Sequence, residues 1–378
     1  MFWKVFQILK NSHSGFVIKI QLINRWLLNF KDLRIGYAPY SETLKRPGDR
    51  RRFCYYAASR GIKFEFAKPS ETYDLVYVTH AADLTVWSNY HKGNAKIVYD
   101  FIDSYLAVPR FDKKGIFRGL AKYVSGQYKY LQLNHWKTIQ SMCQRADAVA
   151  CTTLEQKQDI LPFCPNVHLI LDIKSMYNQV KKDYSAGEVF NLAWEGLPHS
   201  INSFHEIRPV LSYLKKKHKI ALHMVTALEF GQFMGKYWKR NTTDFVHELF
   251  DFDNIYLYQW HEQLCSHIIS ACDLALVPLL STDIFDWNKP EDKLLIFWLM
   301  GLPTVVSANP SHSRAMKGAG LSMACQNQEN WIETLEHYIR NEEIREEAGQ
   351  KGRAYALKYN SDERILKQWD KFFSSVVS

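Results

Sequence analysis

Residues 273–310 read DLALVPLLSTDIFDWNKPEDKLLIFWLMGLPTVVSANP, and this stretch decides the fold. The apolar run at 274–280 has the length of a buried strand in a parallel sheet. A charged loop at 283–292 follows, then an apolar run of helical length at 293–300, which a Gly-Leu-Pro turn ends before the next strand at 304–306. In α/β sheets, a loop that leads from a strand's carboxyl end into a helix binds phosphates and nucleotides.

The same alternation extends in both directions from this stretch. A chain of 378 residues is long enough for two domains. Strands alternating with helices predict two doubly wound α/β domains of the Rossmann type, with a polar linker at 173–188 and a helical tail. The predicted strands lie at 33–37, 62–66, 73–78, 95–100, 147–151 and 166–171 in the first half and at 189–194, 220–225, 254–258, 274–280 and 304–306 in the second.

We divide the chain into four parts on this basis. They are a basic amphipathic segment at 1–32, an N-terminal domain at 33–175, a C-terminal domain at 189–360 and a last helix at 361–378. The tail is expected to contain helices at 331–340, 342–359 and 362–374.

The chain carries a net charge of +9 and has a pI near 9.0. Such a charge favours an anionic partner, namely a nucleic acid, an anionic lipid or a phosphorylated substrate, although a basic surface alone is the simpler reading. The seven cysteines are scattered without a C-x-x-C pair. We therefore expect reduced cysteines in a cytoplasmic protein and no metal site. No apolar run has the length of a membrane span, and the N-terminus does not resemble a signal peptide.

Two segments combine cations with aromatic side chains. Residues 1–32 contain five lysines and arginines before the first acid at Asp32, and the long segment after the fourth strand includes Arg118 and Lys122. Either segment would suit the inner face of an anionic membrane, with aromatics at the headgroups. The alternative for the first segment is a helix packed on the body of the protein. The second segment would also suit a nucleic acid, or it is a helical pair with a solvated basic face.

Arg50, Arg51 and Arg52 follow a Pro-Gly turn and open a predicted helix. Guanidinium groups bind phosphates in a bidentate manner, so these side chains are candidates to contact an acceptor phosphate or a lipid pyrophosphate. A solvated basic turn is the alternative.

The C-terminal half resembles the GT-B glycosyltransferases, close to the broad group that includes glycosyltransferase family four. The resemblance is clearest over residues 189–370. It is carried by the glycine turn at Gly196, Gln259-Trp260 at a strand end, Ala271-Cys272-Asp273, the segment from Lys289 to Lys293, Met300-Gly301-Leu302-Pro303, Tyr359-Asn360-Ser361 and Trp369.

The resemblance implies two domains facing a cleft, with a last helix that crosses back to the first domain. It implies that the C-terminal domain binds a nucleotide-diphosphate sugar, that the N-terminal domain binds the acceptor, and that no metal or other cofactor is needed. Gly196 would let the backbone approach the donor diphosphate. Thr226 would line the base or ribose pocket, and Trp260 would lie beside the base.

The resemblance also assigns roles to the charged loop. Lys289 and Lys293 would neutralise the diphosphate and the charge that develops as it leaves. Glu291 or Asp292 would hold ribose or sugar hydroxyls. A lysine at a helix start, where acids are usual, supports an anion nearby. A solvated charged loop is the alternative.

One departure from the family pattern stands out. Many family-four enzymes that retain anomeric configuration have two glutamates eight positions apart in this loop and helix. The corresponding positions here hold Asn288 and Ile296. Neither side chain is acidic, so the stereochemical outcome stays open. Glu291 is the candidate to take over one of the two roles, at a different spacing.

Three polar residues at strand ends of the N-terminal domain are candidates for a catalytic base. His80 follows the third strand, and Asp100 and Asp103 follow the fourth. Histidine suits proton abstraction from a hydroxyl near neutral pH. The aspartates would serve the same role in an inverting enzyme. A capping or packing role is the alternative for each of them.

These residues predict a glycosyltransferase that modifies a surface glycan, a lipid-linked oligosaccharide or a lipopolysaccharide core, at the inner face of the cell membrane. Two alternatives remain: another nucleotide-sugar activity such as epimerisation, and a scaffold without catalysis that binds glycan or membrane. Nucleic-acid binding is the weakest reading, because the cation-rich stretches lack a known motif.

Overall fold

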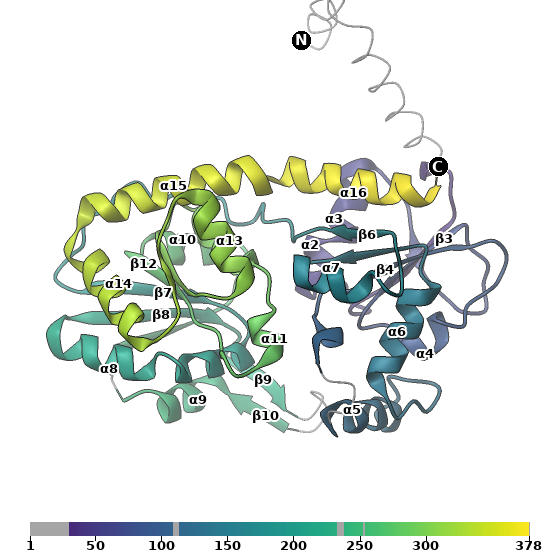
Figure 1. Ribbon diagram of the computed structural model, residues 1–378, viewed down its shortest axis with the longest axis horizontal. Helices are drawn as coiled ribbons and strands as arrows, with labels where there is room; N and C mark the ends of the chain where they lie inside the picture. Colours follow the sequence, from purple (N-terminus) through teal and green to yellow (C-terminus); the bar gives the residue numbers. More distant parts are fainter. Residues whose placement is uncertain (1–29, 109–112, 233–237, 252–253, 378) are drawn as a thin grey trace, which may run out of the picture.

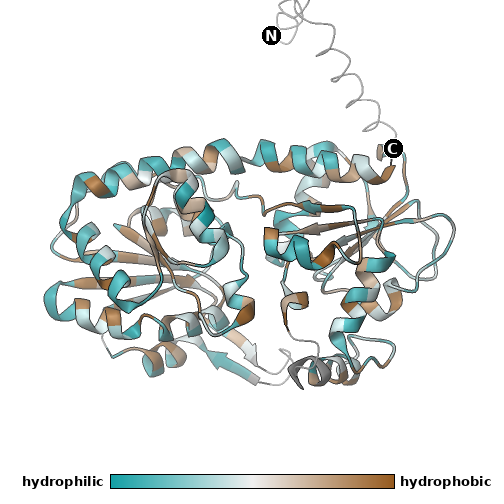
Figure 2. Ribbon diagram, viewed as in Figure 1, coloured by the Kyte–Doolittle hydropathy of each residue, from teal (hydrophilic) through white to brown (hydrophobic). Residues whose placement is uncertain are grey.

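A computed structural model of the protein describes residues 30–108, 113–232, 238–251 and 254–377. Within these ranges the chain forms two parallel sheets of six strands each, with helices on both faces, lying next to one another (Figure 1). Hydrophobic residues are concentrated in the strands of both sheets (Figure 2). The predicted pair of doubly wound domains is confirmed. The segment 1–29, most of the predicted amphipathic N-terminus, lies outside the described residues.

The N-terminal sheet has the strand order β2-β1-β3-β4-β5-β6, with every pair parallel. Strands buried on both faces need continuous apolar runs, and most strands of this sheet have them. The strands are β1 (Ile35–Ala38), β2 (Glu65–Phe66), β3 (Leu75–Thr79), β4 (Lys96–Asp100), β5 (Ala148–Cys151) and β6 (Val167–Leu169).

Short helices connect these strands. Asp83 caps α4 by accepting from the Thr85 amide at 3.0 Å, and Thr153 caps α7 in the same way. The helical elements are α2 (Pro47–Arg51), α3 (Phe53–Arg60), α4 (Leu84–Trp87), η1 (Tyr105–Ala107), α5 (Lys113–Val124), α6 (His135–Arg145) and α7 (Leu154–Ile160).

The C-terminal sheet has the strand order β11-β8-β7-β12-β13-β14 and is also parallel throughout. An antiparallel hairpin of β9 and β10 lies beside it. The strands are β7 (Phe190–Glu195), β8 (Ile220–Thr226), β9 (Glu229–Gln232), β10 (Trp238–Asn241), β11 (Ile255–Gln259), β12 (Leu274–Val277), β13 (Thr304–Ser307) and β14 (Ala324–Cys325).

Residues 203–217 of this domain do not form one continuous helix, because Pro209 lacks an amide proton and lies in the first turn of a new helix. Helices at 242–249, 284–287 and 310–319 were not predicted from the sequence. The elements are η2 (Pro198–His205), α8 (Arg208–Lys217), α9 (Thr242–Leu249), α10 (Cys265–Ser270), α11 (Ile284–Trp287), α12 (Asp292–Leu299), α13 (Pro310–Ala319), α14 (Gln328–Arg340), α15 (Glu342–Asn360) and α16 (Asp362–Val377).

The last two helices join the domains along one side of the molecule (Figure 1). Helix α15 packs on α12 of the C-terminal domain, and α16 crosses to the N-terminal domain. There Trp369 and Phe373 belong to a core with Phe53 and Tyr77. Asp370 of α16 accepts hydrogen bonds from the side chain of Arg60. The expected helix crossing back is therefore present.

The linker at 173–188 contains no helix or strand, yet it is not a solvated tether. Tyr177 and Tyr184 are buried in it. The Lys174 ammonium lies 2.6 Å from a carboxylate oxygen of Asp292, and that of Lys181 donates to the carbonyl of Cys272 at 2.8 Å. The linker is thus fixed to the C-terminal domain by buried polar contacts.

A buried ion pair connects the end of β4 to the linker. The Arg52 guanidinium donates to both carboxylate oxygens of Asp100, at 2.7 to 3.0 Å, and both side chains are fully buried. Arg52 also donates to the carbonyl of Ile170 at 2.9 Å and pairs with Asp172 at 3.1 Å. The hydroxyl of Tyr40 donates to Asp100 at 2.8 Å. Nearly all polar atoms of the Arg52 and Asp100 side chains therefore have a hydrogen-bond partner.

We predict that Arg52→Met lowers the free energy of unfolding by about 3–5 kcal/mol, because it leaves the Asp100 charge buried without compensation. Chemical denaturation measures the change. Arg34→Met is the matched control, since Arg34 forms exposed ion pairs that solvent screens, and its loss should change stability little. Equal stability of the Arg52 and Arg34 variants would contradict the structural role given to Arg52.

Candidate functional site

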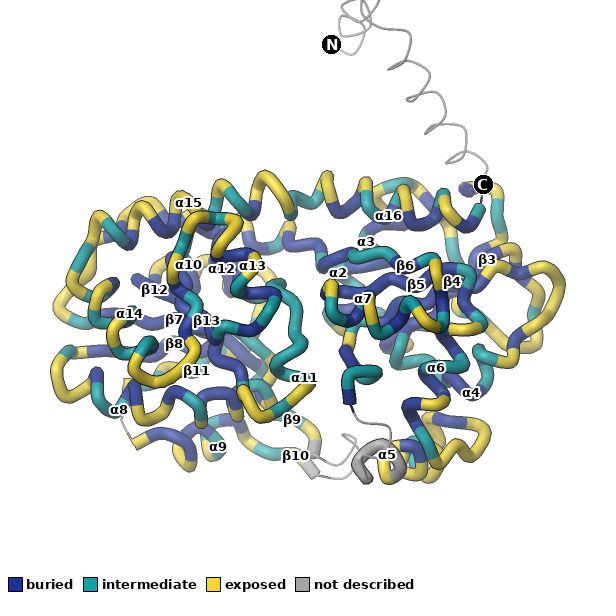
Figure 3. Tube along the Cα trace, in the orientation of Figure 1, coloured by how far each residue is buried: buried dark blue, intermediate teal, exposed yellow. Residues whose placement is uncertain are grey.

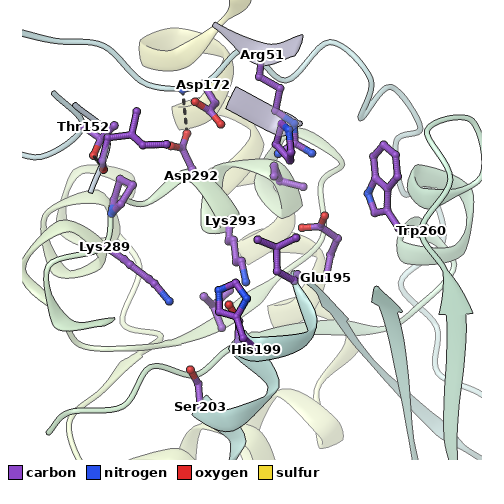
Figure 4. Close-up of a pocket in the computed structure, with 18 of the residues that line it drawn as sticks. Arg51, Thr152, Asp172, Glu195, His199, Ser203, Trp260, Lys289, Asp292 and Lys293 are labelled. Carbon is purple, nitrogen blue, oxygen red and sulfur yellow. Dashed lines mark hydrogen bonds between the residues drawn. The ribbon is translucent and has the colours of Figure 1, made fainter. Parts of the chain in front are cut away.

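A cavity of about 510 Å³ lies between the carboxyl ends of the two sheets, which is where open α/β sheets bind ligands. Residues of both domains line it, and Figure 4 shows their side chains converging on it. The lining includes Arg50, Arg51, Asp103, Thr152 and Asp172 from the N-terminal side and linker, and Glu195, Gly196, His199, Trp260, Lys289, Asp292, Lys293, Ile296 and His312 from the C-terminal domain.

Lys293 lies in the first turn of α12 and extends into this cavity (Figure 4). Burial, with the charge of Lys289 as a second cause, lowers the pKa of Lys293 to about 8. Its ammonium lies 5.0 Å from the centroid of the Trp194 ring. Among the described residues it has no carboxylate within ion-pair distance. A cation in this state is suited to bind an anion that enters the cavity.

Lys289, unlike Lys293, forms an ion pair within the described part of the chain. Its ammonium pairs with Asp286, which also accepts from Ser203 at 2.9 Å. Asp283 caps α11 within the same loop, so the loop is held by side-chain hydrogen bonds. Lys289 lines the cavity with a third of its side chain exposed. It therefore adds positive potential beside Lys293 while its own charge is partly neutralised.

Gly196 has a steric role that explains why glycine follows β7. A Cβ atom at this position would overlap the ammonium of Lys293 and the ring of Trp194. A side chain here would require the Lys293 ammonium and the Trp194 ring to shift. The glycine thus makes room for a cation as well as for a ligand.

The acids of the charged loop do not occupy the positions expected of them. Glu291 precedes α12 and does not line the cavity, and burial raises its pKa to about 7. Asp292 lines the cavity, but it pairs with Lys174 and accepts from the Asp172 amide at 3.3 Å. The structure therefore does not support the predicted contact of Glu291 with a ligand hydroxyl.

The two residues predicted for the base and ribose pocket differ in placement. Thr226 is fully buried at the end of β8 and does not line the cavity. Trp260 lines it, just after β11. The Arg50 guanidinium lies 4.8 Å from the Trp260 ring centroid and pairs with Glu262 at 3.0 Å. Arg50 therefore bridges the two domains at the edge of the cavity.

The three candidate bases differ in whether they line the cavity. Asp103 lines the cavity, and its carboxylate lies 3.5 Å from His80 Nε2. His80 itself does not line the cavity, and burial lowers its pKa. Asp100 is fully buried and paired with Arg52. The structure does not support Asp100 as a base or Arg52 as an acceptor contact, because neither group is accessible.

The remaining predicted cations lie on the N-terminal side. Arg51 lines the cavity and donates to the Tyr177 hydroxyl at 2.8 Å. Arg118 and Lys122 of α5 are outside the cavity lining and lie over the rings of Tyr105 and Tyr128. Burial, and next the charge of Arg118, lower the pKa of Lys122 to about 8.

Sequence reasoning missed several polar cavity residues, among them Glu195, His199 and His312. Glu195 ends β7, and its position at a strand end directly before a glycine turn could have indicated it. His312 is buried in the first turn of α13, and burial lowers its pKa to about 4. Its helix was not predicted, although Asn309 as the N-cap and Pro310 in the first turn are local signals of a helix start. Among the described residues, no cluster of three or more His, Cys, Asp or Glu side chains could hold a metal ion.

Comparison with known proteins supports the fold. No protein-family model and no curated protein sequence matches the chain. Solved structures do match it. HepE from Anabaena in complex with UDP-glucose has a TM-score of 0.60 at 12% identity, over 91% of this chain and 100% of that one. Sucrose-phosphate synthase from Thermosynechococcus elongatus has a TM-score of 0.55 at 14% identity, over 85% and 75%.

TarM has a TM-score of 0.57 at 14% identity, over 79% of this chain. The match spans about half of TarM, 54% of its length. A TarM mutant from S. aureus was solved in complex with fondaparinux, alpha-GlcNAc-glycerol and UDP. At these identities the similarity is one of fold. The chain has the GT-B fold of these glycosyltransferase structures.

Proposed function

We propose that the protein is a glycosyltransferase that moves a sugar from a nucleotide-diphosphate sugar to a hydroxyl group of a glycan or lipid-linked acceptor. The observation that carries this proposal is the enclosed ammonium of Lys293, which faces the interdomain cavity and, within the part of the chain that the structure describes, pairs with no carboxylate. The complexes of HepE with UDP-glucose and of TarM with UDP support it by analogy of fold.

The donor diphosphate would bind at the start of α12. Backbone amides and the helix dipole attract anions at a helix N-terminus, and Lys293 adds a full charge there. Gly196 would allow the diphosphate to approach the backbone after β7. As the bond to the sugar breaks, negative charge grows on the leaving diphosphate, and Lys293 with Lys289 would stabilise it.

The acceptor would enter from the N-terminal side of the cavity. Asp103 is the candidate base, because its carboxylate lines the cavity and lies close to His80. Arg51 is available to contact an anionic group of the acceptor.

A membrane surface would bring lipid-linked acceptors to this site. In the described residues, no helix has the length and apolar character to cross a bilayer. Residues 117–133 of α5 and the loop after it are mostly exposed (Figure 3), and the exposed ones include apolar side chains on the same segment as Arg118 and Lys122. An amphipathic surface of this kind binds anionic headgroups and buries aromatics at the interface. The exposed side chains are Phe117, Leu120, Tyr123, Val124, Tyr130, Leu131 and Leu133.

A thermal-shift screen with nucleotide diphosphates and their sugars tests the proposal, because a ligand of the native state raises its stability. Product analysis without an acceptor distinguishes transfer from epimerisation. Failure of every nucleotide to bind would favour a scaffold that binds glycan or membrane.

Replacing Lys293 by methionine is predicted to weaken UDP binding at least about tenfold, or about 1.4 kcal/mol. The side chain keeps its length but loses the charge that would face the diphosphate. Calorimetry measures the affinity, and sugar transfer should fall with it. Lys351→Met is the control, because Lys351 is exposed on α15 and pairs with Glu347. Unchanged affinity in the Lys293 variant would exclude the phosphate role.

Donor binding should also depend on pH through Lys293. In the free protein its pKa is about 8, so the ammonium is charged below that pH and neutral above it. A bound diphosphate favours the charged form and raises this pKa. Affinity for UDP is therefore expected to fall as pH rises above the free pKa, and binding there should take up a proton. Calorimetry in two buffers of different ionisation enthalpy counts the protons, and Lys293→Met should abolish the uptake.

The α5 surface predicts binding to vesicles that contain anionic lipid. Substituting Phe117 and Leu120 by serine should reduce co-sedimentation with such vesicles several-fold, because it removes exposed apolar area without changing the charge. Affinity for UDP should stay the same. Leu357→Ser on α15 removes a similarly exposed side chain and should not affect vesicle binding. Loss of binding in both variants would argue against a specific role for α5.

A further inference from the structure

The wall of the cavity in the C-terminal domain presents three chemical groups in a fixed order. The strand order β11-β8-β7-β12 places Trp260 after β11, Glu195 at the end of β7, and Lys293 on α12, which follows β12. Figure 4 shows the same order, with the Glu195 carboxylate between the Trp260 indole and the Lys293 ammonium. All three side chains line the same cavity.

A nucleoside diphosphate carries its own groups in a matching order, with the base at one end, the ribose in the middle and the phosphates at the other end. An aromatic ring suits the base and an ammonium suits the phosphates. The ribose presents two adjacent hydroxyl groups, and a carboxylate is the side chain that accepts from two hydroxyls at once. We propose that Glu195 binds the ribose hydroxyls of the donor nucleotide.

The other acids of the cavity are already engaged. Asp172 pairs with Arg52, Asp292 pairs with Lys174, and Asp103 lies beside His80 across the cavity. Glu195 accepts one long hydrogen bond, at 3.3 Å, from the Tyr177 hydroxyl. Its remaining acceptor positions are available for a ligand.

Glu195 is nevertheless 7% exposed, and a buried carboxylate needs nearby positive charge. Arg51 and Lys293 supply it. The Arg51 guanidinium donates to the Tyr177 hydroxyl, which donates to Glu195, so the chain of hydrogen bonds starts in the N-terminal domain. Burial and the charge of Lys289 lower the pKa of Lys293, and the negative charge of Glu195 opposes that shift.

This assignment also accounts for Ile296. The resemblance predicts an acid at that position of α12, and the isoleucine there lines the cavity but cannot accept a hydrogen bond. Glu195 offers a carboxylate to the same cavity from β7 instead of α12. In this proposal the carboxylate comes from the end of strand β7 and not from helix α12, and Glu291 is not needed as its substitute.

The inference rests on the proposed binding of a nucleotide donor. Its test distinguishes failure of the inference from failure of the proposed function. Calorimetry compares UDP, GDP and ADP with their 2′-deoxy forms, which differ only in one ribose hydroxyl. The wild-type protein should bind its preferred ribonucleotide at least about tenfold more tightly than the deoxy form, as expected for a buried acceptor left unpaired. In Glu195→Ala the ratio should fall to about two or less, because no acceptor remains.

Two further variants make the result specific. Glu195→Asp keeps the charge but shortens the side chain, and an intermediate ratio is expected. Glu188→Gln is the control, since Glu188 is 78% exposed just before β7 and should leave the ratio unchanged. Measuring the unfolding midpoint of each variant verifies that it is folded. If Glu195→Ala does not fold, Glu195→Asp provides the test of the ribose preference.

The outcomes are distinct. Nucleotide binding with an unchanged ribose preference in the Glu195 variants would overturn this inference and leave the proposed function standing. A wild-type protein that binds a nucleotide without preferring ribose would overturn it equally. Absence of binding by all three nucleotides would overturn the proposed function as well.

Discussion

The buried pair of Arg52 and Asp100 is the contact on which the arrangement of the two domains depends. Two charges removed from water are stable only when every partner is in place, so the pair constrains the segments that it joins. Arg52 reaches β4 through Asp100, and the linker through Ile170 and Asp172. The amide of Asp172 in turn donates to Asp292 at the start of α12. A continuous set of polar contacts thus runs from the N-terminal sheet to the floor of the cavity.

These contacts determine which charges remain available in the site. Asp172 and Asp292 are used to hold the linker against α12, so their charges are neutralised by Arg52 and Lys174. Lys293 lies one residue further along α12, and its ammonium pairs with no carboxylate among the residues that the structure describes. The residues that hold the site together are therefore separate from the residues that are proposed to bind the ligand.

Much of the fold follows from local patterns. Buried strands of a parallel sheet require continuous apolar runs, so β3, β4, β8 and β12 could be found from the sequence. The division between η2 and α8 depends on Pro209 and on the packing around it, and β14 has only two residues. Elements of this kind carry too little periodic signal to be predicted.

By itself, the sequence determined the alternation of strands and helices, the glycine after β7 and the lysine at the start of α12, because each depends on residue types at short spacing. Only the tertiary structure decided which charged residues face the cavity. Asp100 and Asp103 are three positions apart, yet one is buried against Arg52 and the other lines the cavity. Glu195 and Trp260 are far apart in the chain, and they line the same cavity because β7 and β11 end at the same edge of one sheet. Partners of this kind are set by strand order, which is a property of the whole domain and not of a local pattern.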